Sequence, residues 1–139
     1  MKCILIVVFA GLFVLSVVSN AQAAGCSNGS VKGSFGFILT GTRIGGTDPG
    51  LRATVGQFTS DGKGNLSGYE TKSKNGTIIL DVTITGTYTV NPDCTGSTTI
   101  TGSDGEVKNF DFVIVDKHYE VFGIQVDDGR VTTFNAKKQ

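Results

Sequence analysis

The sequence predicts an all-β protein, an eight-stranded antiparallel up-and-down β-barrel. Short runs of β-branched and aromatic residues fill most of the chain, and no window of ten or more residues has the apolar spacing of a capped helix. Turn-forming Gly, Asn and Asp residues separate the runs, and only 42–51 is a long connection. Consecutive strands with short connections form a meander, and closing it into a barrel removes its exposed edges. A β-sandwich is the alternative, although its crossovers normally need several long connections.

Residues 1–23 are typical of a signal peptide. Lys2 is followed by an uncharged apolar run and then by the small-residue triplet 21–23, an A-x-A cleavage site. The run is about 16 residues long, which is short for a bilayer span of roughly 20. We therefore expect 24–139 to form one exported domain, secreted or periplasmic, without a membrane span. A retained anchor is one alternative, and lipid attachment at Cys26, in an imperfect lipobox, is another.

The first four strands are expected on either side of glycine-containing turns. Residues 32–41 alternate small residues with Phe and Leu, 52–60 and 64–74 flank the turn DGKGN, and 76–90 follows Asn75-Gly76. Gly and Asn supply the positive φ angles that tight hairpins need. The segment 76–90 is the longest alternating run, and it ends at Asn91-Pro92-Asp93, where proline favours a turn.

The last four strands follow the same pattern. Residues 95–102 are rich in threonine, 107–116 alternate Phe and Ile with polar residues, 118–127 are apolar on both faces, and 130–136 complete the sheet. Asp104-Gly105 and Asp128-Gly129 are the expected turns at one end of this half.

Cys26 and Cys94 are the two cysteines left after removal of the signal peptide, and in an oxidising compartment they are expected to pair. Closing the long loop between them should stabilise the fold by about 4 kcal/mol. Cys94 follows the fourth strand, half-way round the barrel from the first. Residues 26–31 extend up to about 20 Å and must cross the floor of the barrel to reach it. Any ligand must then enter at the opposite end.

That opposite end carries a collar of mixed charge, either a solvated loop end or a rim that selects ligands. Its candidate residues are Arg43, Arg52, Lys74, Asp127 and Arg130.

The interior should be lined by alternating apolar positions. It is either filled by its own side chains or holds one small apolar ligand. Candidate interior residues are Phe35, Phe37, Leu39, Glu70, Tyr88, Phe110, Phe112, Phe122 and Phe134, and Ile78, Leu80, Ile124 and Val126 are assigned to the same faces. Glu70 shares a face with Leu66, which makes it the candidate for an interior carboxylate, whereas Asp81 should point outwards.

A second apolar stripe should lie on the outside of the sixth and seventh strands. Val113, Val115 and Val121 alternate with the residues assigned to the interior. A stripe of this kind needs a cover, and a homo-oligomer interface is one such cover.

Composition and motifs exclude several functions. The 12 Lys and Arg balance the 12 Asp and Glu, so the chain lacks the basic surface that nucleic-acid binding needs. His118 is the only histidine and is expected in a solvated turn, which leaves no zinc ligand set once the cysteines are paired. The turn at Asp61 lacks the ligands of a calcium loop. We expect no cofactor and no metal.

Several stretches resemble a group of small exported bacterial proteins of unknown function. These are GSFGFILTG, GQFTSDGKGNLSG, GTYTVNPDCTGS, FDFVIVDKHYEV and the ending AKKQ. Those proteins resemble the allene oxide cyclase barrel, which is related to dirigent and lipocalin-like folds. The resemblance implies a closed barrel and carries no catalytic residue over to this chain.

The sequence thus favours an exported, non-enzymatic barrel that binds a small apolar ligand. A cyclase or isomerase that uses the cavity with Glu70 or Tyr88 is the first alternative. A self-assembling surface protein is the second.

Overall fold

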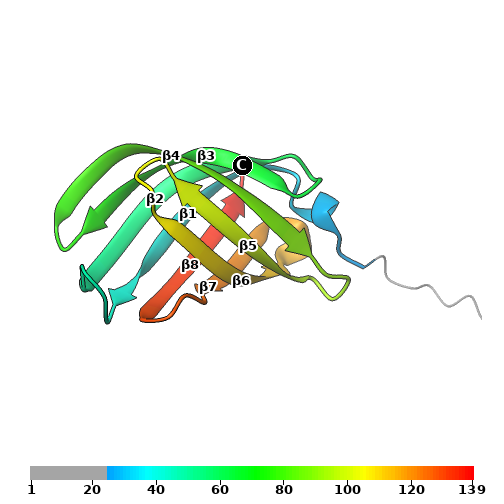
Figure 1. Ribbon diagram of the computed structural model, residues 1–139. Helices are drawn as coiled ribbons and strands as arrows, with labels where there is room; N and C mark the ends of the chain where they lie inside the picture. The colour runs from blue at the N-terminus through cyan, green and yellow to red at the C-terminus, as the bar shows by residue number, and fades with distance from the viewer. Residues whose placement is uncertain (1–24) are drawn as a thin grey trace, which may run out of the picture.

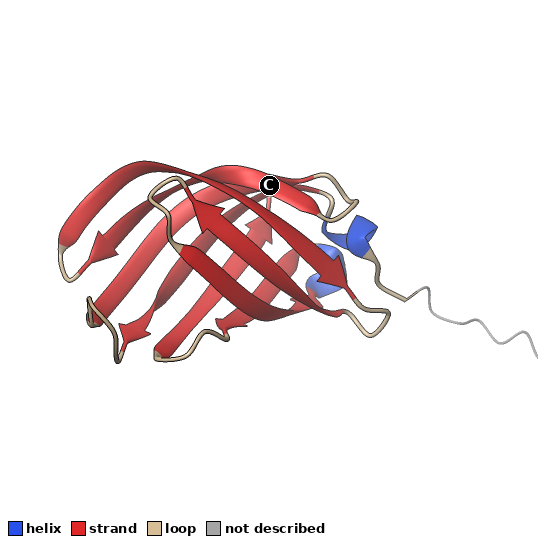
Figure 2. Ribbon diagram, viewed as in Figure 1, coloured by secondary structure: helices blue, strands red, loops and turns tan. Residues whose placement is uncertain are grey.

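The computed structural model describes residues 25–139, so the expected signal peptide lies outside the described residues. Eight antiparallel strands close into a barrel in chain order, with β8 paired to β1 (Figures 1 and 2). The predicted fold is confirmed, and the β-sandwich alternative is wrong. The strands are β1 (Gly33–Arg43), β2 (Gly50–Ser60), β3 (Asn65–Lys74), β4 (Thr77–Val90), β5 (Thr95–Gly102), β6 (Val107–Val115), β7 (Glu120–Gln125) and β8 (Arg130–Lys138).

The disulfide joins Cys26 to Cys94, as predicted, with 4.9 Å between their Cα atoms. Between Cys26 and β1 the chain forms a short 3₁₀ helix, η1 (Asn28–Val31), at the end of the barrel seen on the right of Figure 1. Asn28 Oδ1 accepts a hydrogen bond from the Val90 N–H at 2.8 Å, and Val31 is buried against the core. The N-terminal segment therefore closes the floor between β4 and β1.

Glycines make room inside the barrel for aromatic rings from neighbouring strands. A Cβ atom added to Gly96 would collide with the ring of its cross-strand partner Phe112, and one added to Gly123 with the ring of Phe134. The pair of Gly56 and Phe37 repeats the arrangement. Alternating small and large residues in this way fills the narrow interior of a small barrel.

A β-bulge corrects the assignment of the upper half of β4. The pairing of β3 with β4 shifts between Glu70 and Lys72, and Asp81 in the bulge has a φ of 53°. Because a bulge adds one residue, the alternation reverses beyond it. Ile78 and Leu80, expected inside, are therefore exposed. Asp81 is exposed, as expected.

The assignment of strand β7 was also wrong, by one residue. Phe122, Ile124 and Val126 face the solvent, whereas Val121 points inwards and is only 5% exposed. The strand is shorter than expected because η2 (Asp116–His118) precedes it, with positive φ at three successive residues. Phe134 already fills the interior opposite Gly123, so the large side chains of β7 lie outside.

Candidate functional site

The barrel interior is divided into an apolar lower part and a charged upper part. The lower part, next to the floor, contains a cavity of about 60 Å³. It is smaller than the roughly 300–1,000 Å³ of pockets for drug-sized ligands. Seven of the predicted interior residues line it, namely Phe37, Leu39, Glu70, Tyr88, Phe110, Phe112 and Phe134.

The remaining two predicted interior residues lie elsewhere. Phe35 is fully buried and stacks on Phe58, with 5.2 Å between ring centroids. Phe122 lies on the outer surface and is 42% exposed. Val121, assigned to the outer stripe, lines the cavity instead. The wall of the cavity therefore lacks two of the predicted aromatic side chains and includes Phe58 and Val121 instead.

Glu70 is the carboxylate at the upper wall of the cavity, and it is 2% exposed. Lys108 Nζ donates to both of its oxygens, at 2.7 and 3.0 Å. Lys72 Nζ lies 3.0 Å from Glu70 Oε1. Alternation along β3 explains this placement. Leu66, Glu70 and Lys72 are separated by even numbers of residues, so their side chains all lie on the inward face of the strand.

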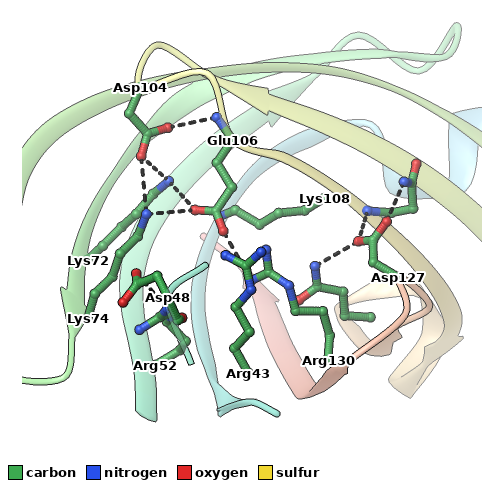
Figure 3. Close-up of polar contacts among 12 residues, drawn as sticks. Arg43, Asp48, Arg52, Lys72, Lys74, Asp104, Glu106, Lys108, Asp127 and Arg130 are labelled. Carbon is green, nitrogen blue, oxygen red and sulfur yellow. Dashed lines mark hydrogen bonds and ion pairs between the residues drawn. The ribbon is translucent and has the colours of Figure 1, made fainter. Parts of the chain in front are cut away.

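An ion-pair network extends from Glu70 to the upper mouth, and Figure 3 shows its upper members. Lys72 Nζ lies 2.9 Å from Asp104 Oδ2 and 3.0 Å from Glu106 Oε2. Arg130 Nη1 lies 3.2 Å from Glu106 Oε1, and Lys74 approaches both carboxylates. The network closes the upper end of the barrel with charged side chains that are mostly buried.

Mutual attraction within the network shifts the pKa values of its members. Burial alone would raise the pKa of Glu106, but the hydrogen bond and charge of Lys72, with Lys108 and Lys74, lower it to about 2. Burial opposes the charged form of Lys72, yet the carboxylates around it raise its pKa. Burial lowers the pKa of Lys108, despite its contact with Glu70. Despite burial, the neighbouring lysines also lower the pKa of Asp104, so Asp104 and Glu106 are held ionised.

Arg52 was expected in the collar at the rim, but its side chain turns inwards and is only 8% exposed. Its Nη2 donates to Asp48 Oδ2 at 2.8 Å, and its Nη1 donates to the carbonyl of Leu51 at 3.2 Å. Within residues 25–139 its Nε–H has no hydrogen-bond acceptor. A buried donor without an acceptor is costly and calls for a partner.

A second, smaller cavity of about 20 Å³ lies among these upper side chains. Arg52, Lys72, Lys108 and Arg130 contribute to its walls. Leu39 and Lys108 line both cavities, so the two spaces adjoin at these side chains.

The other predicted rim residues lie at the upper end, as expected, but their charged groups are already engaged. Arg43 Nε donates to the Gly45 carbonyl at 3.0 Å, away from both cavities. Asp127 accepts hydrogen bonds from Asn109 and Gln125. Lys74 and Arg130 belong to the ion-pair network.

Sequence reasoning missed Lys72, Lys108 and Glu106. The alternation of side chains along a strand could have placed both lysines inside. Lys72 lies two residues from Glu70, and Lys108 lies two residues from Phe110, so each shares a face with a residue predicted inside. Charged residues are rarely buried without partners, so the alternation alone did not identify these lysines as interior residues.

His118 and the two disulfide-bonded cysteines lie close enough together for a metal site, but the cysteines cannot act as metal ligands. Nε2 of the exposed His118 lies 3.4 Å from Cys26 Sγ, near Cys94. Both sulfurs are joined to each other, and zinc requires thiolates. The Asp61 carboxylate is used by its own turn, where hydrogen bonds from Asn65 and Lys63 lower its pKa to about 2.

The predicted outer stripe is present in part. Val113 is 40% exposed and lies with Phe122 and Ile124 along a groove on the outside of β5, β6 and β7. Val115 is half-buried. A homo-oligomer through this face stays a prediction. Within residues 25–139 no helix has the length and hydrophobicity to span a bilayer.

Comparisons with known proteins identify the fold and no family. No protein-family profile and no curated protein matches the sequence. The expected kinship with allene oxide cyclase barrels therefore stays a prediction.

Three solved structures share the fold, and all three are designed. A de novo designed fluorescence-activating β-barrel is 14% identical and aligns with a TM-score of 0.55 over 78% of this chain and 93% of its own. The redesigned barrel b11L5F_LGL is 18% identical, with a TM-score of 0.54 over 81% of this chain and 94% of its own. The redesigned barrel mFAP1, bound to DFHBI, is 16% identical, with a TM-score of 0.53 over 80% of this chain and 97% of its own.

Proposed function

We propose that the protein is an exported, non-enzymatic binding module whose lower cavity holds a small, mainly apolar molecule. The observation that supports this most is the cavity itself, about 60 Å³ in volume and walled by aromatic and aliphatic side chains. Dry apolar cavities bind small apolar molecules such as benzene or xenon. The disulfide agrees with an oxidising compartment. The designed barrel mFAP1, which shares the fold, is bound to the small ligand DFHBI.

Size limits the ligand to a compact body. The floor is closed by η1 and the disulfide, and the upper mouth by the ion-pair network. A molecule that enters must therefore pass the upper side chains, because the backbone of a closed barrel leaves no gap between strands.

The geometry of Glu70 supports a binding role over an enzymatic one. A general base must reach the proton that it abstracts. Both oxygens of Glu70 already accept hydrogen bonds from Lys108, and Lys72 also lies within ion-pair distance. The hydroxyl of Tyr88 donates to the Asn28 carbonyl at 3.2 Å, which directs it to the floor. Neither group named for the cyclase alternative is free to act on a substrate.

Binding is tested by titrating xenon and benzene while recording methyl carbon–proton NMR spectra. We expect saturable shifts at the cavity methyl groups of Leu39, Leu66 and Ile100, because these side chains line the space. The variant Val121→Phe should abolish the shifts by filling the cavity. Val113→Phe is the matched control, since it enlarges an outward valine on the neighbouring strand.

Two results would reject the proposal. One is the absence of saturable shifts at the cavity methyl groups in the wild-type protein. The other is shifts confined to Ile124 and Val113, which would place the binding in the outer groove. If instead the cavity methyl groups show saturable shifts, mass spectrometry of small molecules that co-purify with the protein would identify a natural ligand.

A further inference from the structure

The cavity of about 20 Å³ in the upper part of the barrel is walled by more cationic than anionic side chains, namely Arg52, Lys72, Lys74, Lys108 and Arg130 against Glu106. Four cations and three carboxylates form the connected ion-pair network, namely Lys72, Lys74, Lys108 and Arg130 with Glu70, Asp104 and Glu106. Arg52 and Asp48 form a separate pair, and Arg43 and Asp127 at the outer end add one charge of each sign. Despite burial, the charge of Arg130 also lowers the pKa of Asp127, so Asp127 is a further counter-charge to the network; of all these carboxylates only Glu106 lines the upper cavity.

An unused hydrogen-bond donor lies in the same region. The side chain of Arg52 is more than nine-tenths buried, and its Nε–H has no acceptor among the described residues. Its two Nη atoms are held by Asp48 and the Leu51 carbonyl, so the guanidinium group is fixed in place. Arg52 also lines the cavity of about 20 Å³ together with Lys72, Lys108 and Arg130.

We propose that the ligand is a monocarboxylate, with its carboxylate in the upper cavity beside Arg52 Nε and its compact apolar body in the lower cavity. This inference rests on the proposed binding function and names the class of ligand. An unused donor in a cavity walled by five cationic side chains and one carboxylate favours an anionic acceptor. A charge-assisted hydrogen bond from Arg52 Nε–H to a carboxylate satisfies this donor.

The two cavities are placed for a single molecule to occupy both. Leu39 and Lys108 belong to the walls of each, so the ligand body lies below them and its head group above. Lys108 stays bound to Glu70 and contributes its charge, while Arg52 provides the hydrogen bond. The carboxylate thus lies between cationic side chains that are mostly buried.

The test compares benzoate with benzyl alcohol, which has a similar body and no charge, by calorimetry and NMR. We expect benzoate to bind at least about tenfold more tightly, the effect of one hydrogen bond to a charged group. In the wild-type protein the Nε–H resonance of Arg52 should move downfield with benzoate and stay in place with benzyl alcohol. Its assignment comes from through-bond correlations to the side-chain carbons of Arg52 in the wild-type protein.

Two variants separate the role of Arg52 from its charge. Arg52→Lys keeps the charge but lacks the Nε–H, and it should lose most of the preference for benzoate. Arg43→Lys is the matched control and should keep the preference, because Arg43 is directed to Gly45 and lines neither cavity. The wild-type Nε–H shift decides the question even if Arg52→Lys does not fold.

Equal affinities for benzoate and benzyl alcohol would overturn the carboxylate inference and leave the proposed binding function standing. Benzoate binding that survives Val121→Phe would reject the lower cavity as its site, and with it the proposed function. If chloride moves the Nε–H resonance as much as benzoate does, and benzoate binds no more tightly than chloride, the site takes an inorganic anion only and the inference fails.

Discussion

Replacing Glu70 by Gln should be among the most destabilising single changes in the barrel. Glu70 is 2% exposed and is the only carboxylate within ion-pair distance of Lys108 among the described residues. The amide of glutamine is close in size but uncharged. The change therefore leaves the Lys108 ammonium buried without a carboxylate in ion-pair contact, whereas Lys72 keeps Asp104 and Glu106.

The expected cost is about 3–5 kcal/mol, as for other buried ion pairs that lose one partner. For a domain of this size such a loss lowers the melting temperature by more than about 10 °C. Most of this cost is the uncompensated charge and not the strength of the pair itself. Replacing both partners, as in Glu70→Gln with Lys108→Met, should then cost clearly less than the sum of the two single changes.

The assay is urea unfolding at pH 7 followed by far-ultraviolet circular dichroism, since the chain has no tryptophan. Glu120→Gln is the control, because its ion-pair partner Lys137 is 72% exposed, and it should cost no more than about 1 kcal/mol. A loss below about 1 kcal/mol for Glu70→Gln would refute the reasoning. So would a double variant whose loss equals the sum of the single losses.

Two further predictions concern the floor and the upper mouth. Cys94→Ser should lower the free energy of unfolding by about 4 kcal/mol under non-reducing conditions only, because the disulfide spans 68 residues; an unchanged melting temperature would contradict the staple. Glu106 has a pKa of about 2 in the fold, below its ordinary 4.5, so it stabilises the protein above about pH 4.5 and loses this effect as the pH falls towards 2. Stability measured over that range should fall less steeply for Glu106→Gln than for wild type, and parallel curves would contradict the assignment.

The sequence by itself determined the strands, the turns and the pairing of Cys26 with Cys94. These features follow from local rules: alternation with a period of two, positive φ at Asn and Gly in hairpins, and the presence of only two cysteines after residue 23. Because the connections are short, consecutive strands pair in chain order as a meander, and its two edge strands, β1 and β8, pair with each other. The inward position of Glu70 also followed from alternation along its strand.

Only the tertiary structure decided which faces of β4 and β7 point inwards and how the interior charges are balanced. A bulge at Asp81 reverses the alternation, and no local pattern around it reveals this. In β7 both faces are apolar, so the choice depended on Phe134, which fills the space at Gly123 from the neighbouring strand. Lys108 is buried because Glu70 lies across the barrel from it, and such a partnership exists only once the barrel has closed.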